Sequence, residues 1–305
     1  MIKVLGSVLL GMLLAMPVLA CSKDGKTGIA PENNQWLPSD YVSPFKRGQD
    51  RVDEVKFNQI IDEVTAVYAP IVASMGGKLV VNRHWEDGTV NAYASREGKT
   101  WFVDMFGGLA RHDAVTPDGF ALVMCHELGH HIAGYPKYDG DWASSEGQSD
   151  YFATAKCFKH VYGKMNNSLV FFERFSSAID TNCAAVYKTQ NEVATCVRNA
   201  LGGQSLANLL ADLGGDKLPK IETPDKTVVK HHDHTHPAAQ CRLDTYFQGS
   251  LCAKAGLTKV GTDNYKEGYC AREDRDTIGV RPLCWFSEAD AKASKKADLF
   301  SRTRF

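Results

Sequence analysis

The chain contains 305 residues, with 35 lysine and arginine against 36 aspartate and glutamate side chains and a formal net charge of −1. Because positive and negative side chains are almost equal in number, the composition gives no support for nucleic acid or any other polyanion as a partner. The length allows one substantial hydrophobic core with a small appended region.

The amino terminus predicts export. Lys3 precedes an apolar run over residues 4–19, which is too short for a comfortable membrane span and is typical of a signal peptide. We therefore expect a lipoprotein-type signal peptide over residues 1–20. No second hydrophobic stretch of the sequence is long enough to span, so we expect no transmembrane helix in the mature chain.

The residues around Cys21 favour a lipid anchor. Val18-Leu19-Ala20-Cys21 resembles a bacterial lipobox, in which the cysteine is lipidated and becomes the first mature residue. Leu19 is a less common residue at its place, so cleavage at a nearby alanine is the alternative. By the same resemblance, Ser22 indicates the outer membrane. We expect an exported protein of the bacterial cell envelope, facing the periplasm, with residues 21–49 as a polar tether.

A helix and three strands are expected next. Residues 52–75 favour a helix interrupted near Pro70. Segments 78–85, 90–96 and 100–106 are rich in β-branched and aromatic residues, with turns between them, and they predict a small antiparallel sheet. An extended peptide could join the edge of such a sheet through main-chain hydrogen bonds. The alternative is an ordinary structural meander.

The segment around His126 predicts a metal-binding helix. An N-cap at Thr116 and a stop at Gly134 bound a stretch with apolar residues at every fourth position. It contains H-E-x-x-H, which places His126 and His130 one turn apart on a single helix face. Two neutral imidazoles so placed can bind Zn²⁺, and Glu127 can take a proton from a metal-bound water. The alternative is a helix with surface histidines.

A second helix is expected to supply the third ligand. Ser145 with Gln148 predicts a capping box at its start, and Gly163 ends it. Glu146 and Asp150 are four residues apart and therefore share one side of this helix. With the helix folded back on the first, Glu146 would ligate the metal and Asp150 would accept a hydrogen bond from a ligand imidazole. The alternative is an acidic first turn favoured by the helix dipole.

The nine cysteines fit an oxidising compartment, and setting Cys21 aside leaves an even number. We expect a disulfide between Cys125 and Cys157, which would join the two helices of the metal site. For the other six, the simplest expectation is nearest-neighbour pairing: Cys183 with Cys196, Cys241 with Cys252, and Cys270 with Cys284. A cysteine-rich second metal site is the competing interpretation, although the chain has no C-x-x-C.

Residues 214–235 are rich in lysine, aspartate and proline and favour an exposed linker or loop. His231, His232 and His234 within it could capture a metal, but flexible histidines bind without defined geometry. A solvated loop is therefore the favoured interpretation for these three. Residues 236–305 form a cysteine-rich carboxy-terminal region, which we expect to pack on the preceding domain.

Five motifs occur together in this chain: Asn91-Ala92-Tyr93-Ala94, Gly107-Gly108-Leu109, the H-E-L-G-H helix within residues 120–131, Glu146 with Asp150, and His236-Pro237 with Arg242-Leu243. Together they resemble the gluzincin peptidases of the HtpX and BepA type. The resemblance covers residues 55–160 and, locally, residues 235–245. The one departure is the separation of Glu146 from His130, which is shorter than in those proteins.

The resemblance implies an α+β fold. Residues 50–213 would form a mostly helical, zincin-like metallopeptidase domain with a small antiparallel sheet beside the H-E-x-x-H helix. It also implies one Zn²⁺ per chain, with His126, His130 and Glu146 as ligands and Glu127 as the catalytic base. The peptide substrate would lie on Asn91, Ala92 and Tyr93.

The resemblance extends to two later residues. His236 is expected to face the active site, where it would either stabilise the oxyanion or occupy the open position of the metal as a latch. Arg242 is expected near the site as well, or as a structural residue that ties its loop to a carboxylate near the metal.

Peptide hydrolysis is the activity that the motifs favour: a zinc-dependent endopeptidase acting, by resemblance, on unfolded or misassembled envelope proteins. One alternative is a non-proteolytic, zinc-containing, chaperone-like binding module that uses the same groove. The other is a structural lipoprotein whose motif has lost its function. Retention of Glu127 argues against the last, because a structural zinc site has no need for this residue.

Overall fold

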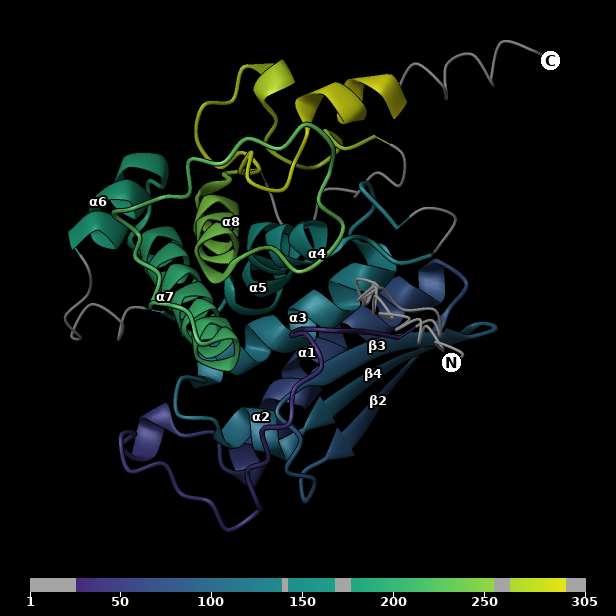
Figure 1. Cartoon of the computed structure of the whole chain (residues 1–305), viewed down its shortest axis with the longest axis vertical. Coiled ribbons are helices and arrows are strands. Elements are labelled where there is room, and N and C mark those ends of the chain that lie inside the picture. Colours follow the sequence, from purple (N-terminus) through teal and green to yellow (C-terminus); the bar gives the residue numbers. More distant parts are fainter. Residues whose placement is uncertain (1–25, 139–141, 168–176, 255–263, 295–305) are drawn as a thin grey trace, which may run out of the picture.

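The computed structural model describes residues 26–138, 142–167, 177–254 and 264–294, which form an α+β structure (Figure 1). Its sheet contains four strands in the order β1-β3-β4-β2. Their bounds are β1 Lys26–Gly28, β2 Lys78–His84, β3 Ala92–Glu97 and β4 Thr100–Phe106. The strands β2, β3 and β4 were predicted; β1 was not. The predicted signal peptide and Cys21 lie outside the described residues.

The prediction of a wholly antiparallel sheet is wrong, because β2 and β4 run parallel. The turn at Gly98, with φ +57°, joins β3 and β4 as a hairpin, as expected. The turn at Asp87-Gly88 is not a hairpin loop. The carbonyl of Asp87 accepts a hydrogen bond from the backbone of Gly108, at the start of α2 (Gly107–Arg111). The chain therefore leaves β2 without turning back along it, and β3 pairs with β4 on the side opposite β2.

Helix α1 (Glu54–Ser74) packs against the sheet and against α3. The expected interruption at Pro70 is wrong, since the helix continues for another turn. A proline inside a helix costs about 3 kcal/mol. Here Tyr68 and Val72 are buried on either side of it, and their packing offsets that cost.

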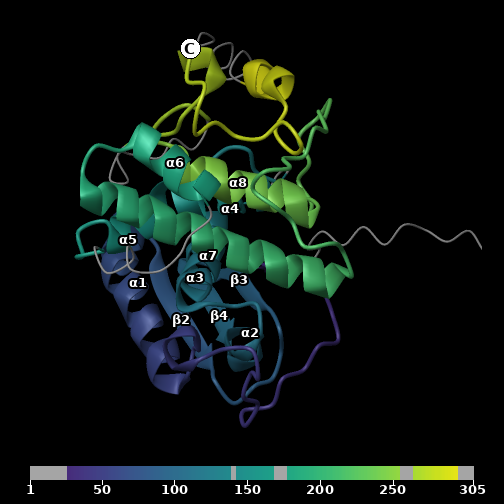
Figure 2. The same cartoon turned by 90° about the vertical axis from the view of Figure 1, so that its left-hand side faces the viewer.

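Helix α3 (Pro117–Ile132) runs through the centre of the molecule, between the sheet and helix α7 (Figure 2). It begins as predicted: Thr116 Oγ1 accepts a hydrogen bond from Gly119 N at 3.1 Å, and Pro117 takes the first position. Every residue from 119 to 132 is buried. The alternative of a helix with surface histidines is therefore wrong.

The second helix of the site starts and ends at the predicted residues but is not regular. It comprises α4 (Glu146–Phe152), a π-helical turn η2 (Ala153–Cys157) and α5 (Phe158–Tyr162), followed by Gly163. The predicted capping box is wrong, because Ser145 makes no side-chain cap. The Gln148 side chain instead donates to the carbonyl of Ala133 and accepts from Arg281, since neighbouring segments bury it.

Three further helices complete the helical layer: α6 (Ser177–Val186), α7 (Gln190–Gly214) and α8 (Ala239–Leu251), with short 3-10 turns at Gly48–Asp50 and Arg272–Asp274. Residues 216–238 contain no helix or strand. Residues 264–294 pack beyond α8, on the side away from the sheet (Figure 2). There the indole of Trp285 donates to Thr245 of α8. No helix in the described parts of the chain is both long and apolar enough to cross a membrane.

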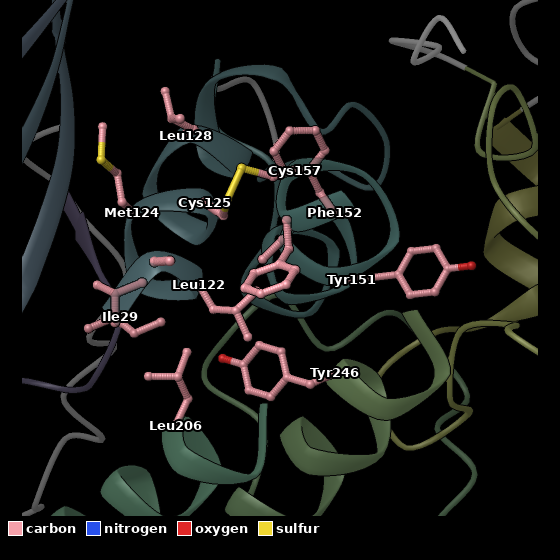
Figure 3. Packing of buried hydrophobic residues seen from close by; sticks show 14 of the residues in the cluster. Ile29, Leu122, Met124, Cys125, Leu128, Tyr151, Phe152, Cys157, Leu206 and Tyr246 are labelled. Carbon is pink, nitrogen blue, oxygen red and sulfur yellow. A yellow bond between two sulfur atoms is a disulfide. The ribbon is translucent and has the colours of Figure 1, made fainter. Parts of the chain in front are cut away.

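Four disulfides link the described cysteines, and they fit an exported protein. The predicted pair Cys125–Cys157 is confirmed; Figure 3 shows it within the packed core. Cys183–Cys196 is confirmed as well. Nearest-neighbour pairing is wrong for the last four, which pair as Cys241–Cys284 and Cys252–Cys270. The fold brings residues 264–294 back over α8, so sequence proximity does not decide these partners.

Part of the segment expected to be a tether is packed on the domain. Residues 26–28 form β1 and pair antiparallel with β3. Ile29 and Ala30 belong to the main hydrophobic cluster, with side chains 0% and 2% exposed. The polar composition of residues 21–49 predicted a free segment, but these two apolar residues are enough to hold its centre against the core.

Candidate metal centre

The metal ligands predicted from the sequence lie together. His126 and His130 direct their Nε2 atoms toward each other, 3.0 Å apart. Glu146, the first residue of α4, places Oε2 3.3 Å from His126 Nε2 and Oε1 3.6 Å from His130 Nε2. All three side chains are buried, and one ligand atom from each lies within 4.8 Å of the others. This cluster could hold one metal ion.

Gly129 brings the two helices close enough for a carboxylate to reach the imidazoles. A Cβ atom at this position would lie 2.9 Å from Ser149 Cα of α4, which is closer than real contacts allow. Absence of a side chain therefore lets α4 cross α3 at the second histidine. The G of the H-E-L-G-H motif thus has a packing role in this site.

The second nitrogen of each imidazole is engaged. His126 Nδ1 lies 2.7 Å from a carboxylate oxygen of Asp150, and His130 Nδ1 lies 2.8 Å from the carbonyl of Ser144. Both partners can only accept, so both Nδ1 atoms carry the proton and both Nε2 atoms present a lone pair. With both imidazoles neutral, the two Nε2 nitrogens and the Glu146 carboxylate would offer only lone pairs to the space between them. The chemistry of this donor set therefore fits a metal ion.

Asp150 is itself fixed by α8. Arg242 donates from Nε and Nη2 to its two oxygens, each at 2.7 Å, and Tyr246 donates its hydroxyl at 2.6 Å. Burial opposes ionisation of Asp150, but Arg242 and His126 hold its pKa below the usual range. The predicted supporting roles of Asp150 and Arg242 correspond to these contacts. Tyr246 was not predicted, although it lies one turn after Arg242.

Burial and neighbouring charges shift the pKa values of the three candidate ligands. Burial lowers the pKa of His130 to about 4, which favours the neutral imidazole that a metal needs. Burial also acts on His126, but Asp150 and Glu146 outweigh it and raise its pKa to about 9. Glu146 is likewise buried, yet the surrounding histidines hold its pKa well below the usual range.

Glu127, the predicted catalytic base, is fully buried beside the ligands. Neither of its carboxylate oxygens has a hydrogen-bond partner among the described residues. Burial raises the pKa of Glu127 to about 8. A buried carboxyl group without a hydrogen-bond partner costs free energy, so this side chain does not stabilise the fold through hydrogen bonds.

His131, the histidine that directly follows the motif, is not one of the clustered ligands. Its Nδ1 accepts from Arg96 at 3.2 Å, and its Nε2 donates to the carbonyl of Phe102 at 3.0 Å. Its ring stacks between Trp101 and Trp142. Both nitrogens are therefore used to dock α3 against the sheet.

His236 lies near the cluster, with Nε2 3.5 Å from Glu146 Oε2. The same nitrogen lies 2.9 Å from the carbonyl oxygen of Gly28, so it donates a hydrogen bond there. Tyr138 completes this side of the site by donating its hydroxyl to Glu146 Oε1 at 3.0 Å. No local sequence signal indicated Tyr138, because it lies in the irregular loop between α3 and α4.

The histidines of the 214–235 loop do not form a second metal site. His231 is exposed, as expected for a solvated loop, and lies 3.2 Å from Asp290. The expectation is wrong for His232, which is buried against residues 285–290. The backbone N–H of Ser287 donates to its Nδ1, and its Nε2 lies 2.9 Å from the hydroxyl of Tyr135. These contacts attach the loop to the carboxy-terminal region.

The residues expected to bind substrate line the edge of β3 beside the ligands. Asn91 is buried, and its side chain hydrogen-bonds both the N–H and the carbonyl of Ala30. The carbonyl of Ala92 accepts from Ile29 N at 3.2 Å, and the hydroxyl of Tyr93 donates to Glu32 at 3.3 Å. These hydrogen bonds, on the side of β3 away from β4, all join the three residues to the amino-terminal segment of the chain itself.

No family model, no curated protein and no solved structure matches this chain. The functional argument therefore depends on the geometry of the site and on the short motifs of the sequence.

Proposed function

We propose that this protein is a zinc-dependent endopeptidase with a zincin-like metal site, one Zn²⁺ per chain, and polypeptides as substrates. The observation that carries the proposal is the buried acceptor-only cluster of His126, His130 and Glu146, with the unpartnered carboxylate of Glu127 beside it. A purely structural metal site gives no reason to bury a second glutamate beside these three ligands.

Each residue of the candidate site has a part in the proposed reaction. Bound at the cluster, Zn²⁺ would acidify a water molecule and polarise the scissile carbonyl. Glu127 would take the proton of the attacking water and pass it to the leaving amine. His236 donates a hydrogen bond to the carbonyl oxygen as negative charge develops there. Asp150 and Arg242 keep His126 in its Nδ1–H form.

The proposed setting follows from the amino terminus and the disulfides. Lipidation at Cys21 would attach the protein to a membrane of the bacterial envelope, and we propose the periplasmic face of the outer membrane. The four disulfides are compatible with that oxidising space. Unfolded or misassembled envelope proteins are the proposed substrates.

The test compares zinc content and casein cleavage in the wild-type protein and in Glu127→Gln. The variant should keep one zinc per chain and lose about 10²-fold or more of its activity, because only the proton transfer is removed. Glu146→Ala should lose zinc as well as activity. Glu97→Gln, at an exposed position of β3, is the matched control and should change neither. Equal activity in wild type and Glu127→Gln would reject Glu127 as the base.

One observation favours a second candidate, the non-proteolytic binding module. The edge of β3 holds β1 as an extended strand. A binding module that holds extended chains without cleaving them would pair with them in the same way. Stoichiometric zinc without cleavage of casein, both by the wild-type protein and by a variant whose residues 26–30 are released from β3, would support this candidate over the peptidase.

A further inference from the structure

Residues 26–30 lie extended along β3, in the place where an extended substrate would bind. β1 pairs antiparallel with β3, with Thr27 opposite Ala94 and Gly28 opposite Tyr93. The ladder continues through the bond from Ile29 N to the carbonyl of Ala92. In Figure 1 this purple segment follows β3 across the molecule.

Two consecutive carbonyls of the segment contact the side chains of His236 and Arg242. Gly28 O accepts from His236 Nε2 at 2.9 Å, and Ile29 O accepts from Arg242 Nη1 at 2.5 Å. His236 is 3.5 Å from the ligand Glu146. The Gly28 carbonyl therefore lies one side chain away from the metal ligands, and it contacts the group proposed to stabilise a substrate oxyanion.

Two positions of the segment, Gly28 and Ile29, restrict the side chains that fit along β3. A Cβ atom at Gly28 would lie 3.0 Å from Asn91 Oδ1 and 3.0 Å from a ring carbon of Tyr93, so only the smallest residue fits without displacement. Ile29 is 0% exposed and belongs to the main core cluster, in which Figure 3 shows it with Leu122 and Leu206. The path along β3 thus accepts a small residue followed by an aliphatic one.

From these contacts we propose that residues 26–30 are an internal inhibitor, which occupies the peptide-binding edge of β3 in place of substrate. To call residues 26–30 an inhibitor rests on the proposed function, because inhibition presupposes an enzyme. Their occupancy of the β3 edge does not depend on catalysis. Substrates gain access when the segment leaves, and the favoured ones carry a small residue followed by an aliphatic residue.

Attachment to the same chain makes the segment a strong competitor. A short flexible connection gives an effective concentration of about 1 mM, so a free peptide of equal intrinsic affinity competes poorly at micromolar concentration. An edge strand near a chain terminus can nevertheless open without global unfolding. The site is therefore closed to weakly binding peptides and open to those that displace the strand.

The test measures occupancy of the β3 edge directly. A fluorescein-labelled peptide with the sequence of residues 24–34 is titrated into zinc-treated protein carrying Glu127→Gln, which prevents cleavage, and fluorescence anisotropy is recorded. Ile29→Asp places a charge in the core and should expel the segment. We expect the peptide to bind this variant at least about tenfold more tightly than its parent. Asn34→Ala, at an exposed position after the segment, is the control and should bind like the parent.

A second readout shows whether the segment has been released. Trypsin cuts after lysine, and Lys26 lies within β1, so cleavage there should be slow in the parent and at least about tenfold faster in Ile29→Asp. Thr27→Pro serves the same purpose without altering the core, in case Ile29→Asp loses its cooperative melting transition. Hydrogen-bonded pairs alternate along an antiparallel ladder, so Thr27 is expected to be the next donor after Ile29.

The proposal is overturned if trypsin cleaves after Lys26 equally fast in the parent and in both variants, or if the released variants bind the peptide no more tightly than the parent. Failure of the proposed hydrolase is a different result: no casein cleavage by the protein with intact Glu127, with or without Ile29→Asp. That result leaves peptide binding and trypsin sensitivity as they were.

Discussion

Replacement of Arg242 tests whether the contact from α8 positions the metal ligands. Arg242 is 1% exposed and its partner Asp150 is fully buried. Arg242→Met would leave a buried carboxylate without its charge partner, which costs about 3–5 kcal/mol in comparable pairs. Asp150 keeps its hydrogen bonds from His126 and Tyr246, so we expect a loss near the lower end, about 3 kcal/mol.

The same variant should bind zinc more weakly. Loss of an outer partner of a ligating histidine reduces metal affinity by about 10–100-fold, which corresponds to about 1.4–2.8 kcal/mol. Urea unfolding of the chelator-treated protein gives the first quantity, and competition with a chromophoric chelator gives the second. Arg242→Lys keeps the charge without the paired geometry and should restore part of both.

Arg198→Met is the matched control for this experiment. Arg198 makes an equivalent two-bond contact with Asp118, which is not in contact with the metal ligands, and it is partly exposed. It should lower stability by a smaller amount and leave zinc affinity unchanged. If Arg242→Met costs less than about 1 kcal/mol and binds zinc as tightly as wild type, the positioning argument is refuted.

Three other outcomes are expected. Gly129→Ala should destabilise the protein by about 1–3 kcal/mol and weaken zinc binding, because its Cβ meets Ser149 Cα at 2.9 Å; unchanged unfolding and zinc titrations would contradict this. Saturating zinc at 1,000 times its Kd should stabilise the protein by about 4 kcal/mol over chelator-treated protein, and no difference in melting would count against a native metal site. Burial lowers the pKa of His232 to about 4 in the folded protein, so the unfolded chain binds more protons between pH 4 and 6.5, and stability should fall as pH drops through that window. His232→Asn keeps an acceptor for Ser287 N and should flatten this dependence, measured by urea unfolding at several pH values; an equal slope in both proteins would exclude His232 as its source.

The parts of the site that the sequence predicts are those with local signals. Three of these signals each lie within a few neighbouring residues: the cap at Thr116, the spacing of His126 and His130, and the start of the second helix before Glu146. Helical geometry then places the imidazoles on one face without knowledge of the rest of the chain.

The parts that sequence analysis missed depend on contacts between distant segments. The composition of residues 21–49 predicted a polar tether, because nothing within these residues indicates that β1 pairs with β3. The parallel alignment of β2 and β4 follows from the packing of Asp87 on α2, some twenty residues later in the chain. His232 lies in a segment whose composition is typical of a loop. It is buried only because residues 264–294 fold back over α8 and cover it.

The disulfide between Cys125 and Cys157 has a consequence for how the protein acquires its cofactor. Cys125 precedes His126 directly, and its partner follows Asp150 on the second helix, so the two ligand-bearing segments are joined covalently. In small zinc domains the ion itself drives folding, and chelators unfold them. Here the disulfide joins the two segments, so a metal ion bound at the cluster could enter or leave a framework that is already built. If the protein is the proposed periplasmic zinc enzyme, scarcity of zinc would stop its activity without unfolding it.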